Sequence, residues 1–231
     1  MMNTAMNIET ARGLLSDWQV AEPKRALITG GSHGIGAHTV VMLAERSWLV
    51  DALTREEFNV ALPVRWPPVV TLDALVLCAG AWGFGKHGSA EWEQDFDRQW
   101  GYFTGHRRLM EHCLPALRAA SGCVIAVAST RAFIGGVDSA PYSVAKAALV
   151  CLMQGLAREY DGVRFNAVCP GLTATRMEAQ VRASGGAKRD TIAQNPESVA
   201  SVIVGLIEGG ANGKVVRVVN ERATAMAWRE E

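Results

Sequence analysis

The chain has 231 residues, of which 49% are hydrophobic and 20% are charged, a composition typical of globular proteins and not of disordered ones. Basic and acidic residues balance at 23 each, so no overall field favours nucleic acid or an anionic membrane. No apolar run approaches the roughly 20 residues of a membrane helix, and residues 1–23 lack the apolar core of a signal peptide. We therefore expect a cytoplasmic protein without nucleic-acid or membrane partners, in which residues 1–23 form an N-terminal extension.

Short apolar runs alternate with longer helical patterns along the rest of the chain. The strand-like runs cover residues 25–30, 48–55, 73–80, 123–129, 163–171 and 214–220, and such runs are typical of strands buried on both faces of a parallel sheet. The clearest helix covers about residues 91–120, where one apolar stripe predicts core packing; its members are Phe96, Trp100, Phe103, Met110, Leu114 and Leu117. The alternation predicts a single α/β domain over residues 24–231, a Rossmann-type doubly wound parallel sheet flanked by helices. The five cysteines are scattered without metal-ligand spacing, so we expect neither a disulfide nor a metal site.

The first candidate site is the segment LITGGSHGIGAHTVVMLAE, residues 27–45, which predicts a strand, a glycine-rich turn and a helix. Gly30, Gly34 and Gly36 let a backbone turn tightly and approach a ligand where a side chain would collide. A helix that begins near Ile35 would point free N–H groups at a phosphate. A purely structural turn would need the same glycines, and only the strand–turn–helix context favours a binding loop, in which we include Ser32 and His33.

Further short motifs follow in a set order: Cys78-Ala79-Gly80, Ser129, Tyr142 with Lys146, Asn166, Pro170-Gly171 and Thr175. Together with the T-G-x-x-x-G-x-G spacing of the glycine turn, they make residues 25–220 similar to the short-chain dehydrogenase/reductase family. The resemblance implies a dinucleotide fold, a nicotinamide cofactor and carbonyl–alcohol chemistry. It also implies cofactor contacts from Ala79, Gly80, Pro170, Gly171, Thr173 and Thr175, although Pro170 and Gly171 could form a plain strand-to-loop turn.

Tyr142 and Lys146 lie four residues apart in the segment PYSVAKAAL, so they share one face of a helix. The pKa of a free phenol is about 10, and a nearby ammonium lowers it towards a useful range for proton transfer. The resemblance implies that Tyr142 is the acid–base, that Lys146 binds the nicotinamide ribose, and that Tyr142 also contacts the cofactor. It also implies that Ser129, thirteen residues before Tyr142, bonds the developing oxyanion. The tyrosine–lysine spacing is common by chance, and Ser129 with the glycine loop favours catalysis over that alternative.

The end of the second predicted strand bears on the choice of nicotinamide cofactor. A carboxylate there favours NAD, whereas an arginine accommodates the 2′-phosphate of NADP. The family's acidic position falls on Thr54 and is followed by Arg55, while Asp51 stands too early in the strand. The sequence therefore predicts NADP, with NAD as the alternative.

Three features differ from the family's usual pattern. The segment between Gly36 and Gly80 is short, which predicts a trimmed sheet edge. Cys78 replaces an asparagine, and packing explains this thiol better than reactivity does. Tyr102, 27 residues before Ser129, stands where the family has an asparagine that helps to hold a water linked to the lysine.

These observations predict an NADP(H)-dependent oxidoreductase that interconverts a carbonyl and a secondary alcohol, with a small-molecule substrate. Four apolar residues follow strand ends and would either line the substrate pocket or join the core: Trp82, Phe84, Phe133 and Ile134. By resemblance we expect a homodimer or homotetramer. The alternative is a dinucleotide-binding sensor or scaffold with little turnover, which Tyr102, Cys78 and the short segment favour.

Overall fold

The protein, represented by a computed structural model, is described over residues 22–54, 69–136, 139–188 and 190–226. Seven strands form one sheet in the order β2-β1-β3-β4-β5-β6-β7. Their bounds are β1 Arg25–Thr29, β2 Leu49–Leu53, β3 Ala74–Leu77, β4 Cys123–Val127, β5 Arg164–Pro170, β6 Val215–Val219 and β7 Arg222–Ala225. The first six are parallel, which confirms the predicted sheet, and β7 pairs antiparallel with β6.

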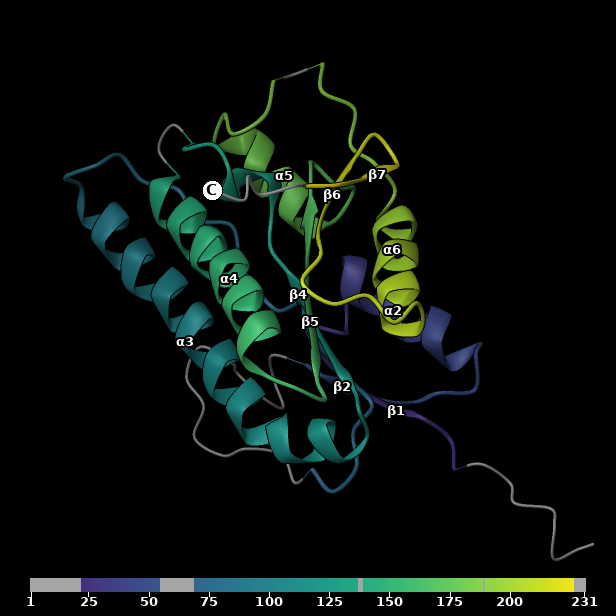
Figure 1. Ribbon diagram of the computed structural model, residues 1–231. Coiled ribbons are helices and arrows are strands. Elements are labelled where there is room, and N and C mark those ends of the chain that lie inside the picture. The colour runs from purple at the N-terminus through teal and green to yellow at the C-terminus, as the bar shows by residue number, and fades with distance from the viewer. Residues whose placement is uncertain (1–21, 55–68, 137–138, 189, 227–231) are drawn as a thin grey trace, which may run out of the picture.

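Helices cover both faces of the sheet (Figure 1). Helices α3 (Ala90–Ala119) and α4 (Ala140–Glu159) lie on one face, and α2 (Gly34–Ala44) and α6 (Pro196–Glu208) lie on the other. Each face has its own core, because neighbouring residues in a strand point to opposite sides. Leu75 and Leu77 of β3 pack towards the α3 and α4 side, whereas Val76 between them packs towards α2 and α6. This burial on both faces explains the continuous apolar runs.

Helix α3 confirms the predicted helix, but its stripe is not uniformly buried. Met110 and Leu117 are in the core, whereas the Trp100 side chain is 45% exposed. Trp92, Phe96, Trp100 and Phe103 instead form an aromatic row along the helix, with successive ring centroids 5.3, 6.5 and 5.0 Å apart. The prediction of core packing is therefore wrong for Trp100. A helix of 30 residues is about 45 Å long and extends well past strands of four or five residues, so its first turns have less sheet to cover.

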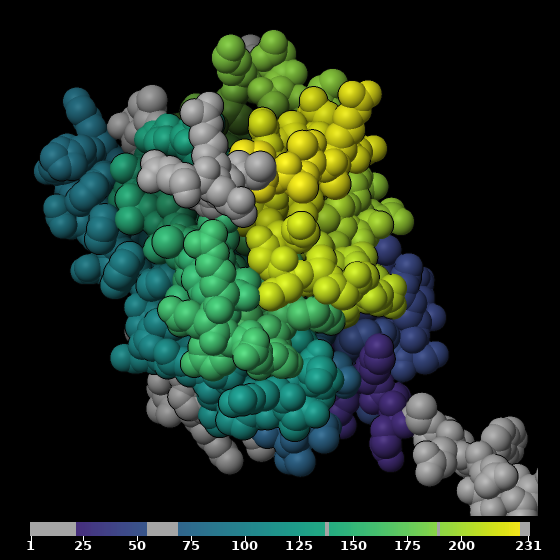
Figure 2. All heavy atoms as spheres, viewed as in Figure 1, coloured from purple at the N-terminus to yellow at the C-terminus, as the bar shows by residue number. Residues whose placement is uncertain are grey.

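Helix α4 is long and apolar enough to cross a membrane by length and composition alone. Its inner face instead belongs to the α/β layers, since Leu149 and Met153 are buried against the sheet and α3. Its outer face is at the surface between α3 and the C-terminal strands (Figure 2), where Val144 is 44% exposed. The helix thus resembles the core helices of globular proteins, and its first turns carry Tyr142 and Lys146.

Asn166 in β5 is fully buried and ties the strand to the loop before β6. Its Oδ1 accepts from the Lys214 N–H at 2.9 Å, and its Nδ2 donates to the Ala211 carbonyl at 2.7 Å. Asn166→Ala should lower the free energy of unfolding by about 2–4 kcal/mol, because two backbone groups lose their partners. Urea unfolding should show a lower midpoint with an unchanged slope.

The matched control is Asn195→Ala at the N-cap of α6. The Asn195 side chain accepts one hydrogen bond, from the Glu197 N–H, at an exposed position. Its loss should cost only about 1 kcal/mol. Equal losses for the two variants would contradict the structural role given to Asn166.

Candidate active site

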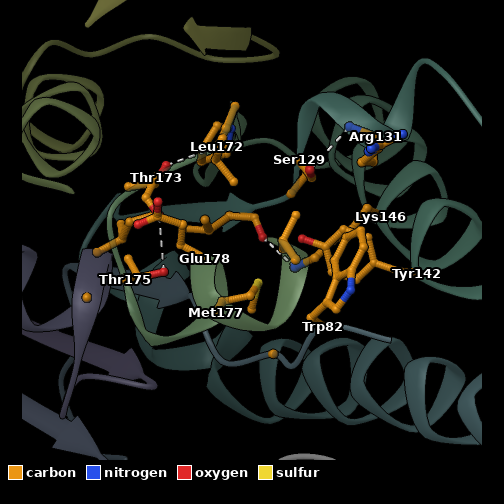
Figure 3. Close-up of a pocket in the computed structure, with 18 of the residues that line it drawn as sticks. Trp82, Ser129, Arg131, Tyr142, Lys146, Leu172, Thr173, Thr175, Met177 and Glu178 are labelled. Carbon is orange, nitrogen blue, oxygen red and sulfur yellow. Dashed lines mark hydrogen bonds between the residues drawn. The ribbon is translucent and has the colours of Figure 1, made fainter. Parts of the chain in front are cut away.

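A cavity of about 650 Å³ opens beyond the carboxyl ends of β1, β3, β4 and β5, where α5 (Arg176–Ala183) covers part of it. The volume lies within the range of small-molecule sites. Figure 3 shows two ends of this cavity. Ser129, Tyr142, Lys146 and Trp82 lie together at one end, and the segment after β5 forms the other.

The glycine-rich turn forms one wall of this cavity and packs too closely for side chains. Gly30 has φ +70°, and a Cβ on it would lie 2.9 Å from the Cα of Ala79. Gly36 does not line the cavity; it lies beneath the turn, where a Cβ would be 2.3 Å from the Gly30 carbonyl oxygen. Helix α2 begins at Gly34, so its first free N–H groups lie at the cavity. The turn has the geometry of an anion-binding loop.

Thr29 joins the glycine turn to the Cys78-Ala79-Gly80 turn. Its Oγ1 accepts from the N–H groups of Cys78 and Ala79, at 3.0 and 3.1 Å. Burial raises the pKa of the Cys78 thiol to about 11, although Lys146 acts in the opposite direction. Cys78 is therefore a protonated thiol at neutral pH, as packing predicts.

Ser129 and Tyr142 come from different elements and meet at the cavity. Ser129 follows β4 and caps the short 3₁₀ helix η1 (Thr130–Ala132), where its Oγ accepts from the Arg131 N–H at 3.2 Å. Tyr142 lies in the first turn of α4 and is buried. Burial raises the pKa of Tyr142 to about 12, while hydrogen bonding with Ser129 and the nearby Arg131 guanidinium act to lower it.

The pKa of Tyr142 lies above its usual value in this structure despite the nearby Lys146, so the expectation that this pKa falls below its usual value is wrong here. The Lys146 ammonium donates to the Val127 carbonyl at 2.8 Å and lies 5.7 Å from the centroid of the Tyr142 ring. Burial also lowers the pKa of Lys146. The removal of the phenol from water therefore outweighs the cations around it.

The segment after β5 forms the wall opposite Tyr142. Its successive turns are closed by the Thr173 hydroxyl, which donates to the Gly171 carbonyl at 3.0 Å, and by the Thr175 hydroxyl, which donates to the Thr173 carbonyl at 3.3 Å. A Cβ on Gly34 would meet the Thr175 methyl group at 2.8 Å, so this segment reaches back to the glycine turn. The glycine turn and the segment after β5, which are distant in the sequence, thus line the same cavity.

Nearly all the predicted site residues meet at this cavity. Its lining includes Gly30, Ser32, His33, Ile35, Ala79, Gly80, Ser129, Tyr142, Lys146, Pro170, Gly171, Thr173 and Thr175. Gly36 supports it from below, and Arg55 lies outside the described residues. Asp51, which was excluded as a cofactor ligand, is part of β2 and pairs with Arg25 at 3.3 Å.

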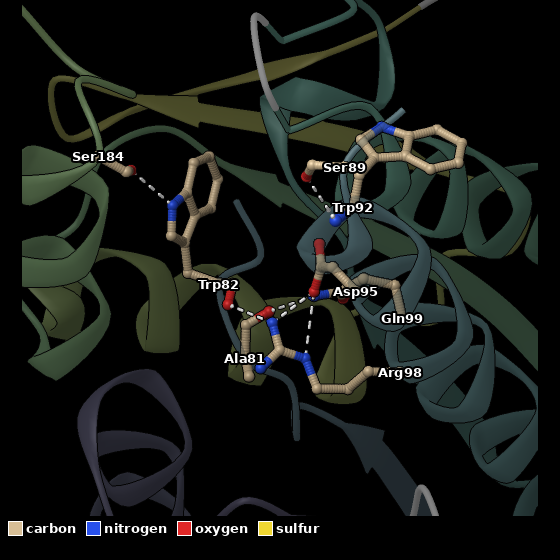
Figure 4. A network of polar contacts seen from close by, with 8 residues as sticks. All are labelled: Ala81, Trp82, Ser89, Trp92, Asp95, Arg98, Gln99 and Ser184. Carbon is tan, nitrogen blue, oxygen red and sulfur yellow. Dashed lines mark hydrogen bonds and ion pairs between the residues drawn. The ribbon is translucent and has the colours of Figure 1, made fainter. Parts of the chain in front are cut away.

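Trp82 is held in place from several directions. Its ring lies 5.0 Å from that of Tyr142, and its Nε1 donates to the Ser184 hydroxyl at 2.9 Å. On the other side, Arg98 donates to the Trp82 carbonyl at 3.1 Å and pairs with the buried Asp95 (Figure 4). Trp82 is therefore a rigid part of the cavity wall next to the candidate acid–base.

Of the four apolar residues predicted to line the pocket or to join the core, three do one or the other, and Phe84 does neither. Trp82 and Ile134 line the cavity as predicted, whereas Phe84 and Phe133 do not. Phe133 packs against the core and Phe84 is 45% exposed. No motif singled out Arg131 or the individual lining residues Leu172, Met177, Glu178 and Val181. The available signal for Arg131 was its place two residues after Ser129, at the end of a strand.

Tyr102 is buried and lines both the main cavity and a second hollow of about 10 Å³, whose lining also includes Gln99, His106 and Lys146. This volume is at the lower limit of about 10–15 Å³ that a cavity needs to hold one water. Burial, and to a lesser extent Lys146, lowers the pKa of His106 to about 3, so His106 is neutral at pH 7. Its Nε2 lies 3.4 Å from the Thr29 hydroxyl.

His106 predicts a loss of stability in mild acid. Its pKa is about 3 in the folded chain and 6.5 in the unfolded chain, so the unfolded chain binds more protons between these values. The contribution of the neutral, buried His106 to the free energy of unfolding is therefore complete above pH 6.5, and it falls as the pH drops towards 3. Between pH 7.5 and pH 5 the loss should be about 2 kcal/mol.

Denaturant unfolding of the wild type and His106→Gln at both pH values measures this effect, because the variant cannot titrate at this position. The stability advantage of the wild type should shrink by about 2 kcal/mol at pH 5. An advantage that stays the same at both pH values would show that His106 is not buried as a neutral ring.

Comparisons with known proteins agree with this geometry. A profile of the short chain dehydrogenase family matches residues 67–185. The cis-4-hydroxycyclohexanecarboxylate dehydrogenase of Sinomonas cyclohexanicum is 30% identical over 228 residues, which cover 81% of this chain and 90% of that protein.

Two solved structures show the same fold. The 3-ketoacyl-(acyl-carrier-protein) reductase of Brucella melitensis, complexed with NADH, superposes with a TM-score of 0.72 at 21% identity, covering 85% of this chain and 97% of that one. ElxO with NADP bound gives a TM-score of 0.68 at 20% identity, with the same coverage of 85% and 97%.

Proposed function

Because the chain belongs to the short-chain dehydrogenase/reductase family of NAD(P)-dependent oxidoreductases, we propose that it interconverts a carbonyl and a secondary alcohol of a small-molecule substrate. The observation that supports this most is that Ser129, Tyr142 and Lys146 line one cavity with the glycine turn. The relative from Sinomonas is named for an alcohol substrate, 4-hydroxycyclohexanecarboxylate, in keeping with this chemistry.

The residues present fit a dinucleotide. The glycine turn offers free N–H groups at the start of α2, as a pyrophosphate requires, and Gly30 and Gly34 bring its backbone to the cavity without side chains of their own. A Cβ on Gly80 would lie 3.6 Å from the Lys146 ammonium, so the second turn keeps the backbone close to that cation. We assign the phosphates to Gly30, Ser32, His33 and Ile35, and the nicotinamide ribose to Lys146. The bound cofactor supplies or accepts the hydride.

Tyr142 holds its proton at neutral pH, because burial raises its pKa to about 12. It is therefore suited to donate that proton to the carbonyl oxygen in the direction of reduction. Ser129 stabilises the developing negative charge on this oxygen by a hydrogen bond from its hydroxyl. In the direction of oxidation Tyr142 must first lose its proton, so that direction should become faster as the pH rises.

We propose NADP as the preferred cofactor. Strand β2 ends in Ala52 and Leu53, neither of which has a carboxylate. Asp51 lies earlier in the strand and forms an ion pair with Arg25. Arg55, the residue expected to bind the 2′-phosphate, lies outside the described residues. Comparison of the KM values for NADPH and NADH, in the wild type and in Arg55→Ala, tests this preference.

The function is tested by NADPH oxidation against a panel of ketones and aldehydes, alongside NADPH binding followed by fluorescence. Turnover of one carbonyl class, with loss of activity in Ser129→Ala, would support the oxidoreductase. The alternative, a dinucleotide-binding sensor with little turnover, is motivated by Tyr102 in place of the family's asparagine. Tight NADPH binding without turnover of any carbonyl in the panel would favour the sensor.

We also propose a cytoplasmic homodimer or homotetramer. All five cysteines are free thiols, which suits a reducing compartment. The aromatic row of α3 is partly exposed and offers apolar area for a second copy. Light scattering of the purified protein measures the assembly, and a monomer at micromolar concentration would contradict it.

A further inference from the structure

Arg131 places a positive charge at the catalytic end of the cavity, and no step of the proposed reaction uses it. Its backbone N–H donates to Ser129, and its guanidinium is close enough to Tyr142 to affect the pKa of that phenol. Figure 3 labels it beside Ser129, at the opposite end from Thr173 and Thr175. The phosphates of a dinucleotide belong to the glycine turn, so Arg131 is not needed for them.

The side chain of Arg131 has no carboxylate partner within the described chain. It donates one hydrogen bond, to the neutral carbonyl of Gly186. Among the described residues that line the cavity, Glu178 is the one carboxylate, and its Oε1 already pairs with Arg182 at 2.8 Å. A guanidinium has five N–H donors in a planar fork, most of which remain available here.

The contacts around Arg131 set the shape of the space that it faces. Gly186 packs on the Trp82 ring, where a Cβ on this glycine would lie 2.8 Å from the ring carbon Cζ2. The Trp82 ring in turn lies 5.0 Å from that of Tyr142. A chain of contacts therefore runs from Arg131 through Gly186 and Trp82 to Tyr142. A ligand bound at Tyr142 would contact both the aromatic ring of Trp82 and the Arg131 guanidinium.

We propose that the substrate carries a carboxylate and that Arg131 binds it. This inference rests on the proposed carbonyl–alcohol function and names the substrate class, an oxo acid or hydroxy acid. The carbonyl or hydroxyl group lies at Ser129 and Tyr142, the apolar part packs on Trp82, and the carboxylate pairs with the guanidinium. A partly buried cation without an acid partner among the described residues favours such a ligand, since it lacks full hydration.

The simpler explanation is that Arg131 only holds the segment around Gly186 in place. That role predicts an equal loss of kcat/KM for charged and for neutral substrates when the Arg131 side chain is replaced. A carboxylate-binding role predicts a larger loss of kcat/KM for the acid than for its ester. The comparison of an acid with its own ester therefore separates the two roles.

The experiment measures NADPH oxidation with 4-oxopentanoate and 2-oxo-4-phenylbutanoate, each beside its methyl ester, in the wild type, Arg131→Lys and Arg131→Gln. The wild type should prefer the acids. In Arg131→Gln, kcat/KM should fall by about 10- to 150-fold more for the acids than for the esters. Arg131→Lys keeps the charge and should lose less, which provides a second variant if Arg131→Gln does not fold.

A parallel binding measurement separates this inference from the proposed function. Calorimetry of the NADPH-loaded protein with the same two acids should show binding that weakens in Arg131→Gln. Binding that depends on Arg131 without any turnover would support the carboxylate site and contradict the function. Preference for the esters, or an acid-to-ester ratio unchanged by both variants, would overturn the carboxylate site while the function stands. Absence of acid binding, together with no turnover of the acids, the esters or any other carbonyl tested, would overturn both.

Discussion

Tyr142→Phe should lower kcat by about 100- to 10,000-fold for every carbonyl that the wild type reduces, because it removes the proton donor and leaves the rest of the cavity in place. The phenyl ring still fills the space against Trp82, whose ring lies 5.0 Å away. NADPH affinity should therefore change by less than about threefold. Steady-state kinetics and fluorescence titration of NADPH measure the two quantities separately.

Tyr160→Phe is the matched control, since it makes the same chemical change at the C-cap of the same helix. Tyr160 ends α4 and packs on Phe165, with the ring centroids 5.9 Å apart, far along the helix from the cavity end. Its activity should equal that of the wild type. A Tyr142→Phe enzyme with most of its activity would show that another group supplies the proton.

The raised pKa of Tyr142 also shows why the sequence could place this residue but not describe its chemistry. The four-residue spacing to Lys146 is a local property of one helix and is visible in the sequence. The pKa depends on burial by segments far away in the sequence, and that burial outweighs the cations in this structure. The orientation of Lys146 towards the Val127 carbonyl is likewise a tertiary contact.

The sequence predicted the strands correctly where both of their faces are buried. The parallel strands are covered on both faces, so each appears as a short apolar run between turns. Strand β7 was missed because its four residues, Arg-Ala-Thr-Ala, are all exposed and show no apolar pattern. The exposure of Trp100 was missed for a related reason: periodicity shows which side of a helix is apolar but not how far the sheet beneath it extends.

Arg131 marks the limit of motif reasoning at the site. The spacing to Tyr142 identifies Ser129, but no spacing shows which residue of the following turn faces the cavity. That depends on the 3₁₀ turn and on Gly186, which is 55 residues away in the chain. Residues that determine substrate specificity are thus harder to predict from sequence motifs than catalytic residues.

Gly36→Ala should weaken NADPH binding by at least about 100-fold, the second large effect that the structure predicts. A Cβ at this position would lie 2.3 Å from the carbonyl oxygen of Gly30 and 2.9 Å from its carbonyl carbon. Both are backbone atoms, so the glycine turn itself must move. Each N–H that loses its bond to a charged phosphate costs about 1.5–3 kcal/mol, and displacement of the turn affects more than one.

The control is Gly155→Ala in α4, where an added Cβ meets nothing within 4 Å. This variant should leave NADPH affinity unchanged and raise the free energy of unfolding by about 0.5–1 kcal/mol, since alanine restricts the unfolded chain and favours a helix. Gly36→Ala should instead lose about 1–3 kcal/mol through the strained contact. Titration of NADPH and urea unfolding of both variants give the comparison. If Gly36→Ala bound NADPH as tightly as Gly155→Ala, the phosphates would have to lie away from this turn, and the assignment of the cofactor to Gly30, Ser32, His33 and Ile35 would be wrong.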